Sequence, residues 1–106
     1  NWLGLITACT SPEITEYVAD EIKELKIPFG FKANLWKQQP LPVGEIVTFD
    51  KDGFGENPVD VLGSRDDITG EKFYDFSKAM VDKGATILGG CCETKPSHIK
   101  AISKLK

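Results

Sequence analysis

One pattern occurs twice in this chain and limits what it can fold into: an apolar run, then cysteine, then a helix that opens on proline. The first copy is 2–8, Cys9 and Pro12, and the second is 85–90, Cys91–Cys92 and Pro96. Short apolar runs that end in turn residues are typical of buried strands, and proline is favoured at the first position of a helix. Two strands that each lead into a helix indicate β/α units and a parallel sheet.

The remaining elements complete this alternation. Strands are predicted over 2–8, 29–34 and 85–90, and helices over about 12–26, 70–83 and 96–106. Apolar residues at helical spacing predict the inward face of the first helix: Ile14, Tyr17, Val18, Ile22 and Leu25. The same spacing predicts that the second helix buries Phe73, Phe76 and Met80.

The fold class that follows is α/β with an incomplete barrel. Parallel sheets are normally buried on both faces, which three strands and their helices do not achieve alone. A (β/α)₈ barrel takes roughly 250 residues, so this chain of 106 residues corresponds to about three of its eight units. Proline and glycine interrupt residues 35–68, where a hairpin-like insertion is predicted over about 41–57.

Charge and cysteine content exclude several classes. The net charge is −3 and the lysines are scattered among acids, so neither nucleic acid nor a membrane surface is expected as a partner. No apolar stretch approaches the roughly 20 residues of a membrane span. Three cysteines, two of them adjacent, do not suit a disulfide framework, and a reduced, cytoplasmic setting is expected.

The cysteines are the residues that carry chemistry. Carboxyl ends of parallel strands share one edge of a sheet, so Cys9, Cys91 and Cys92 are expected to meet there, and Gly89–Gly90 would relax the backbone for a tight turn. Three thiolates would hold zinc with a fourth position open. Two alternatives stay open at this point: three small buried side chains, or a disulfide between the two adjacent cysteines.

Three further residues near this edge have competing interpretations. Asn34 ends the second strand and is expected either to contact a substrate or to cap a local turn. His98 stands in the first turn of the last helix, where an exposed or capping role is favoured over metal binding. Trp36 is interpreted as a hydrophobic plug.

Two segments resemble a known family. Residues 84–99, which contain Gly89-Gly90-Cys91-Cys92, closely resemble the closing signature of the homocysteine S-methyltransferase family. Residues 9–13 resemble its earlier cysteine motif, and 32–34 fall where the family has a strand that ends in Pro-Asn. The resemblance covers the chain apart from the hairpin region, and it implies a (β/α)₈ barrel of which this chain is the sixth to eighth units.

The resemblance also implies a reaction. Cys9, Cys91 and Cys92 would be the ligands of Zn²⁺, and the fourth position would take the thiol of homocysteine. A methyl group would pass to it from a sulfonium, betaine-type ammonium or folate donor and give methionine. Residues 1–106 alone are expected to have little or no activity, because the other barrel units supply half of the pocket. The alternatives are a non-catalytic zinc–thiolate module and a redox dithiol protein that uses Cys91 and Cys92.

Two positions depart from the family pattern. Ala8 stands where the family commonly has Asn before the first cysteine, which removes an amide near the site. Glu93 stands where Gly is common after the cysteine pair, which adds a carboxylate. Neither departure removes a ligand.

Overall fold

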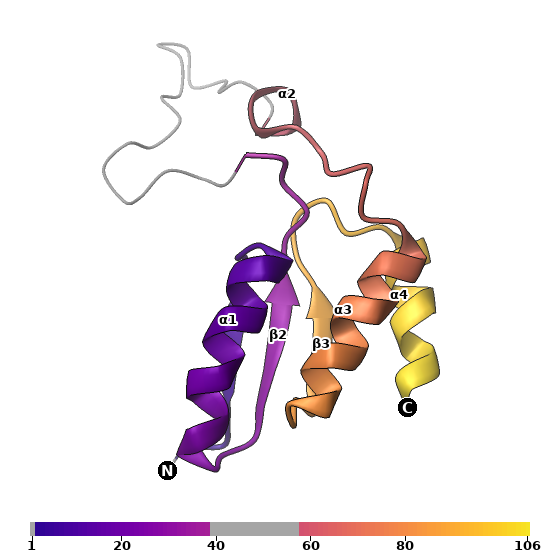
Figure 1. The fold of residues 1–106 in the computed structure, drawn as a ribbon. Helices are drawn as coiled ribbons and strands as arrows, with labels where there is room; N and C mark the ends of the chain where they lie inside the picture. The colour runs from indigo at the N-terminus through magenta and orange to yellow at the C-terminus, as the bar shows by residue number, and fades with distance from the viewer. Residues whose placement is uncertain (1, 39–57) are drawn as a thin grey trace, which may run out of the picture.

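The computed structural model describes residues 2–38 and 58–106 and is a mixed α/β structure with a parallel three-stranded sheet (Figure 1). The strands lie in the order β1-β2-β3. They are β1 (Leu5–Ala8), β2 (Phe29–Ala33) and β3 (Ile87–Gly90). The helices are α1 (Pro12–Ile22), α2 (Pro58–Leu62), α3 (Gly70–Asp82) and α4 (Pro96–Ile102). Short 3₁₀ turns, Lys23–Leu25 and Ser103–Leu105, extend α1 and α4.

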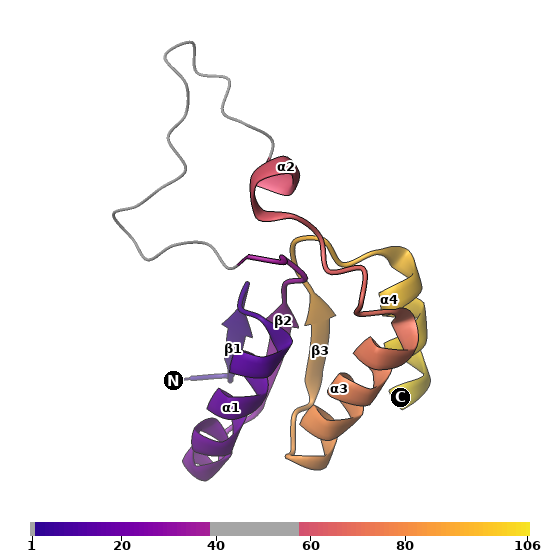
Figure 2. The same ribbon diagram turned by 45° about the horizontal axis from the view of Figure 1, so that its top comes forward.

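The helices form one layer against the sheet. Helices α1 and α3 lie over the same face, α4 lies beside α3, and the three strands point toward the same end, near α2 (Figures 1 and 2). The predicted parallel sheet is therefore confirmed, with β2 in its centre. We call the edge where the three strands end the carboxyl edge. It is formed by the residues that follow the strands: Cys9–Thr10, Asn34–Leu35 and Cys91–Cys92.

An aromatic cluster fills the space between sheet and helices. The ring of Phe31 lies edge-on to Phe73 at 6.4 Å and to Phe76 at 4.8 Å between centroids. Edge-on contacts of this kind suit the charge distribution of aromatic rings. Phe31, Phe73 and Met80 are at most 1% exposed, which confirms the predicted inward face of α3.

The predicted inward face of α1 is largely wrong. Three of its residues are 48%, 73% and 59% exposed: Ile14, Tyr17 and Leu25. The buried residues of the helix are Pro12, Thr15, Ala19 and Ile22. Thr15 can be buried because its hydroxyl is satisfied by the Thr10 hydroxyl at 2.7 Å.

Two strands are shorter than predicted, because hydrogen bonding sets their limits. β1 begins at Leu5, whose partner on β2 is the first residue of that strand, so Trp2 and Leu3 have no strand beside them and are 81% and 92% exposed. β3 begins at Ile87 rather than 85, because the Ala85 N–H bonds the carbonyl of Met80 and belongs to the end of α3. A further difference from the prediction is α2, a short helix within the stretch expected to be irregular. The hairpin predicted over 41–57 lies outside the described residues.

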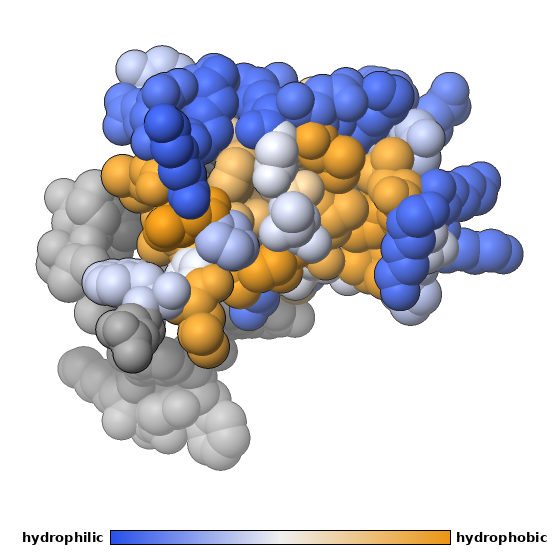
Figure 3. All heavy atoms as spheres, turned by 90° about the horizontal axis from the view of Figure 1, so that it is seen from below, coloured by the Kyte–Doolittle hydropathy of each residue, from blue (hydrophilic) through white to orange (hydrophobic). Residues whose placement is uncertain are grey.

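The second face of the sheet carries six residues that we call the open sheet face. Phe29, Phe31 and Ala33 of β2 face the helices, so Gly30 and Lys32 project to the other side. The register places them in two rows, Ile6–Gly30–Ile87 and Ala8–Lys32–Gly89. Within residues 2–38 and 58–106 no helix covers this face, and Ile6 and Ile87 are 44% and 41% exposed. Seen from below, toward the end where the strands begin, the molecule shows a continuous apolar area bordered by hydrophilic side chains (Figure 3).

None of the described helices combines the length and the apolar character that crossing a bilayer requires.

Candidate metal centre

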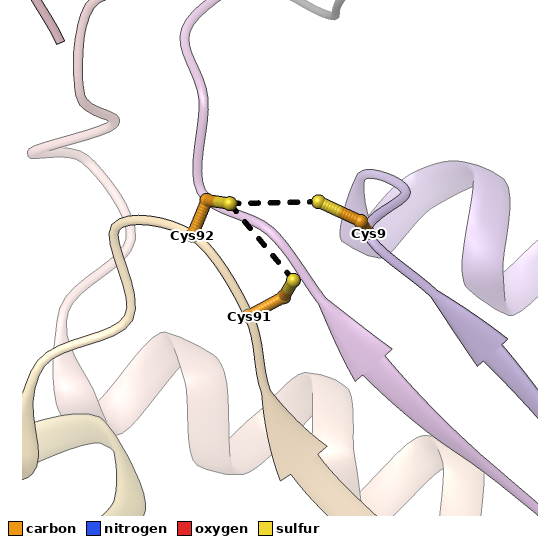
Figure 4. Close-up of side chains that lie close together, drawn as sticks. All are labelled: Cys9, Cys91 and Cys92. Carbon is orange, nitrogen blue, oxygen red and sulfur yellow. Dashed lines mark hydrogen bonds between the residues drawn. The ribbon is translucent and has the colours of Figure 1, made fainter. Parts of the chain in front are cut away.

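The three cysteines predicted to meet are brought together at the carboxyl edge (Figure 4). The sulfur of Cys92 lies 3.6 Å from that of Cys9 and 3.9 Å from that of Cys91. All three sulfurs lie within 4.8 Å of one another, and all three thiols are free. Cys9 and Cys91 are half-buried and Cys92 is exposed, so the cluster opens toward solvent.

The spacing of the sulfurs fits a tetrahedral zinc ion. Zn–S bonds of about 2.3 Å at tetrahedral angles place two sulfurs about 3.8 Å apart. The two separations given above, 3.6 and 3.9 Å, lie on either side of this value. Among the described residues no histidine or carboxylate joins the group.

The chain that leaves β2 holds the two cysteine-bearing turns together. Four backbone hydrogen bonds of 2.8–2.9 Å make this connection: Cys9 N–H to Lys32 O, Asn34 N–H to Thr10 O, Cys91 N–H to Ala33 O and Leu35 N–H to Cys92 O. Cysteines 82 and more positions apart are thus fixed by strand pairing that continues past the strand ends. The main chain at each cysteine is therefore positioned by hydrogen bonds within the chain itself.

The glycines before the cysteine pair have a different role from the one predicted. Neither Gly89 nor Gly90 has positive φ; in this region Cys9 (φ 55°) and Glu93 (φ 62°) do. Gly90 instead provides space, because a Cβ there would lie 2.3 Å from the Thr94 hydroxyl oxygen. That hydroxyl donates to the Cys91 carbonyl at 2.6 Å and closes the turn that carries both sulfurs.

Asn34 is fully buried and points its amide at the first cysteine. Its Nδ2 donates to the Cys9 carbonyl at 2.8 Å and lies 3.8 Å from the Cys9 sulfur. Its Oδ1 accepts the Trp36 N–H at 3.2 Å, so it also caps the local turn. A positioning role for Asn34 follows from these contacts, while its contact with a substrate stays a prediction. Trp36 is 6% exposed, in accord with a hydrophobic plug.

The metal-free cluster distributes its protons unevenly. Burial disfavours the Cys9 thiolate, but hydrogen bonds from Cys91, Cys92 and Asn34 outweigh it and lower the pKa of Cys9 below its ordinary value. Burial, together with the adjacent Cys9 and Cys91, raises the pKa of Cys92 to about 11. The metal-free cluster therefore favours a thiolate at Cys9 and disfavours one at Cys92, and a cation bound between them would stabilise both as thiolates.

His98 caps helix α4 and is buried, so the prediction of a cap is confirmed and that of exposure is wrong. Its Nδ1 accepts the Lys95 N–H at 2.8 Å, and its Nε2 donates to the Ile68 carbonyl at 2.8 Å. Both ring nitrogens are occupied, and the side chain is 5% exposed. His98 is therefore not a ligand of the sulfur cluster.

Arg65 is a residue near this edge that sequence reasoning did not single out. The Arg65 guanidinium forms ion pairs with Glu13 at 2.6 Å and with Asp67 at 2.9 Å. The backbone N–H of Arg65 donates to the Leu35 carbonyl at 2.9 Å. It ties the start of α1 to the loop before α3. The Glu13 partner is 52 positions away, which no local pattern reveals.

These features together describe a parallel β/α protein with a thiol cluster able to hold a metal ion at the carboxyl edge of its sheet. The family model described as homocysteine S-methyltransferase matches residues 2–105, and the chain belongs to this family. It is similar to Homocysteine S-methyltransferase 1 of Zea mays, with 40% identity over 48 residues, which are 45% of this chain. The matched stretch spans only 13% of the length of the maize protein.

Proposed function

We propose that this chain is the zinc-binding part of a homocysteine S-methyltransferase whose complete fold is a (β/α)₈ barrel, with β1–β3 as its sixth to eighth strands. The observation that carries the proposal is the sulfur cluster: three thiols within 4.8 Å of one another, on turns joined by backbone hydrogen bonds, in a chain of this family. The open sheet face supports the barrel, since a parallel sheet normally has both faces covered. In such a barrel this face would line the interior.

The reaction that suits this site is methyl transfer to a thiol. A free thiol with a pKa of about 8.5 is mostly protonated at neutral pH, and bound zinc would keep the homocysteine sulfur deprotonated there. That sulfur would attack the methyl carbon of a sulfonium, betaine-type ammonium or folate donor. A sulfur–carbon bond forms as the donor–carbon bond breaks, and the products are methionine and the demethylated donor.

The residues of this chain would hold and orient the metal rather than react themselves. Cys9, Cys91 and Cys92 would supply the three sulfurs. Asn34 keeps the Cys9 carbonyl and sulfur in place through its amide. Thr94 fixes the turn of the other two through the Cys91 carbonyl. The open side of the cluster, where Cys92 is exposed, would admit the substrate thiol.

Metal analysis of the full-length polypeptide tests this proposal. Purification without air and without chelators is expected to give one zinc ion per chain, and Cys9→Ser, Cys91→Ser and Cys92→Ser are each expected to lose it. Ser103→Ala, which removes an exposed hydroxyl on the turn after α4, is the control and keeps the zinc. Full zinc content in Cys9→Ser would refute the three-sulfur centre, and zinc-free protein with intact thiols would favour a redox dithiol.

Homocysteine binding then separates an enzyme from a zinc store. Capture of the substrate sulfur as thiolate releases a proton, which calorimetry in buffers of different ionisation enthalpy measures. We expect zinc-loaded protein to release about one proton per homocysteine bound. No proton release, with zinc still present, would favour the non-catalytic module.

A further inference from the structure

Lys32 is the exception on an otherwise uncharged face. The open sheet face holds Ile6, Ala8, Gly30, Ile87 and Gly89 besides this lysine. Lysine is almost never found on a covered sheet face unless its charge is paired. In the complete fold proposed above, this face would be covered, so the lysine would need a partner there.

The position of Lys32 ties it to both cysteine-bearing strands. Its carbonyl accepts the Cys9 N–H at 2.8 Å, and it pairs in register with Ala8 and Gly89. Its Cγ lies 3.5 Å from where a Cβ on Gly89 would be, so the side chain passes over the strand that ends in Cys91. Its two register neighbours, Ala8 and Gly89, are small and uncharged.

Two other cations near the carboxyl edge already have anionic partners. Arg65 is bound by Glu13 and Asp67, and Lys95 lies 4.0 Å from Asp66. Lys32 makes no ion pair with any residue in the two described segments. It is therefore a cation on the open sheet face that is available to an anion from outside the described residues.

We propose that Lys32 binds the α-carboxylate of homocysteine while the substrate sulfur lies at the cysteine cluster. This inference rests on the proposed function, because it takes homocysteine as the substrate. At neutral pH the carboxylate is the anionic group of the amino acid moiety, and an ammonium group is its natural partner. Lys32 is then a specificity-determining residue: it selects thiols that carry a carboxylate over those that do not.

The experiment compares two thiols on the zinc-loaded, full-length polypeptide. Homocysteine and 3-mercaptopropylamine differ in the carboxylate alone, and calorimetry gives a Kd for each. Lys32→Met is expected to weaken homocysteine binding roughly tenfold or more, the size of a charge-assisted hydrogen bond, and to leave 3-mercaptopropylamine unchanged. Lys32→Arg keeps the positive charge and is expected to recover part of the loss. Lys78→Met, which removes an exposed lysine of α3, is the control and behaves as wild type.

The outcomes separate this inference from the proposed function. Zinc content is measured in every variant and is expected to stay at one ion per chain. Wild-type homocysteine affinity in Lys32→Met, or an equal loss for both thiols, would overturn the carboxylate contact and leave the methyltransferase proposal standing. Wild-type protein that binds neither zinc nor either thiol would overturn the proposed function itself, before any lysine variant is compared.

Discussion

The two cysteine-bearing turns share one sequence order but reach their geometry differently. After β1, a single cysteine is itself the residue in the left-handed region, and Ser11 caps the helix that follows with a 3.3 Å bond to the Ile14 N–H. After β3, two cysteines precede the left-handed residue, which is Glu93. The helix there is capped by a buried histidine, His98, rather than by a hydroxyl.

In the first turn the strained residue is also a candidate metal ligand, whereas in the second turn the strained residue and the candidate ligands are different residues. A non-glycine residue in the left-handed region costs roughly 1–2 kcal/mol. In the first turn that cost falls on Cys9, so it cannot be removed without removing a sulfur. In the second turn it falls on Glu93, which is not a ligand. The second turn can therefore be altered in stability while the sulfur cluster stays complete.

The largest effect on stability is expected from the space that Gly90 leaves. Gly90→Ala places a Cβ 2.3 Å from the Thr94 hydroxyl oxygen and forces the second turn to shift. We expect a loss of about 3 kcal/mol in the free energy of unfolding, measured by urea denaturation. Gly89→Ala is the matched control, since its Cβ would meet its nearest atoms at an ordinary 3.5 Å. Equal losses in both variants would show that Thr94 does not limit the turn.

The two helix caps are expected to differ in strength. His98→Ala leaves the Lys95 N–H and the Ile68 carbonyl without their partner, and we expect a loss of about 2 kcal/mol in the free energy of unfolding. Ser11→Ala removes one longer hydrogen bond and is expected to cost about 1 kcal/mol. Urea denaturation of both variants gives the ranking. A larger loss of stability in Ser11→Ala than in His98→Ala would show that the hydroxyl cap, and not the histidine cap, is the stronger one.

The protein is expected to become more stable when the backbone strain at Glu93 is relieved. Glu93→Gly removes the Cβ at φ 62° and should raise the free energy of unfolding by about 1 kcal/mol. Glu93→Ala removes the carboxylate but keeps the Cβ, so it should give no such gain. If the alanine variant were stabilised as much as the glycine variant, the carboxylate rather than the backbone would be the source. Zinc content should be the same in all three proteins.

The smallest effect is a pH dependence confined to the first turn. Burial works against the Glu13 carboxylate, but its hydrogen bond with Arg65 prevails and lowers the pKa of Glu13 below its ordinary 4.5. A pKa lowered by folding contributes stability above the unfolded value, which is lost as the pH falls through the folded value. The side chain is 61% exposed, so we expect less than about 1 kcal/mol.

Glu13→Gln tests this contribution. Unfolding measured from neutral pH down through the range below 4.5 should show a smaller acid-dependent loss in the variant than in wild type. Identical pH profiles would mean that the contact between Arg65 and Glu13 does not stabilise the fold. Helix α4 has no acidic residue in its first turn, so the second turn has no equivalent of this contact.

Periodicity and local signals predicted what depends on neighbours in sequence. The helix predicted over 70–83 is α3, whose ends are set locally: the Thr69 hydroxyl accepts the Lys72 N–H, and Gly84 has φ 105°. The strand ends brought the cysteines together because parallel pairing puts them on one edge. The first result follows from local signals, and the second from the general geometry of parallel sheets.

Tertiary contacts decided what the sequence did not reveal. Thr15 is buried in place of Ile14 because Thr10 satisfies its hydroxyl. His98 is buried because the Ile68 carbonyl, 30 positions away, accepts from its ring. The left-handed φ of Cys9 and the space required at Gly90 depend on how each turn meets its neighbours. Spacing along the chain contains none of these distances.

Zinc-edge X-ray absorption of the full-length polypeptide tests the central claim most directly, because it counts the sulfurs bound to the metal. We expect three sulfurs at about 2.3 Å with one lighter ligand in the resting protein, and four sulfurs after homocysteine is added. A shell dominated by nitrogen and oxygen would contradict the cysteine centre. A sulfur count that homocysteine does not change would contradict the role of that centre in binding the substrate thiol.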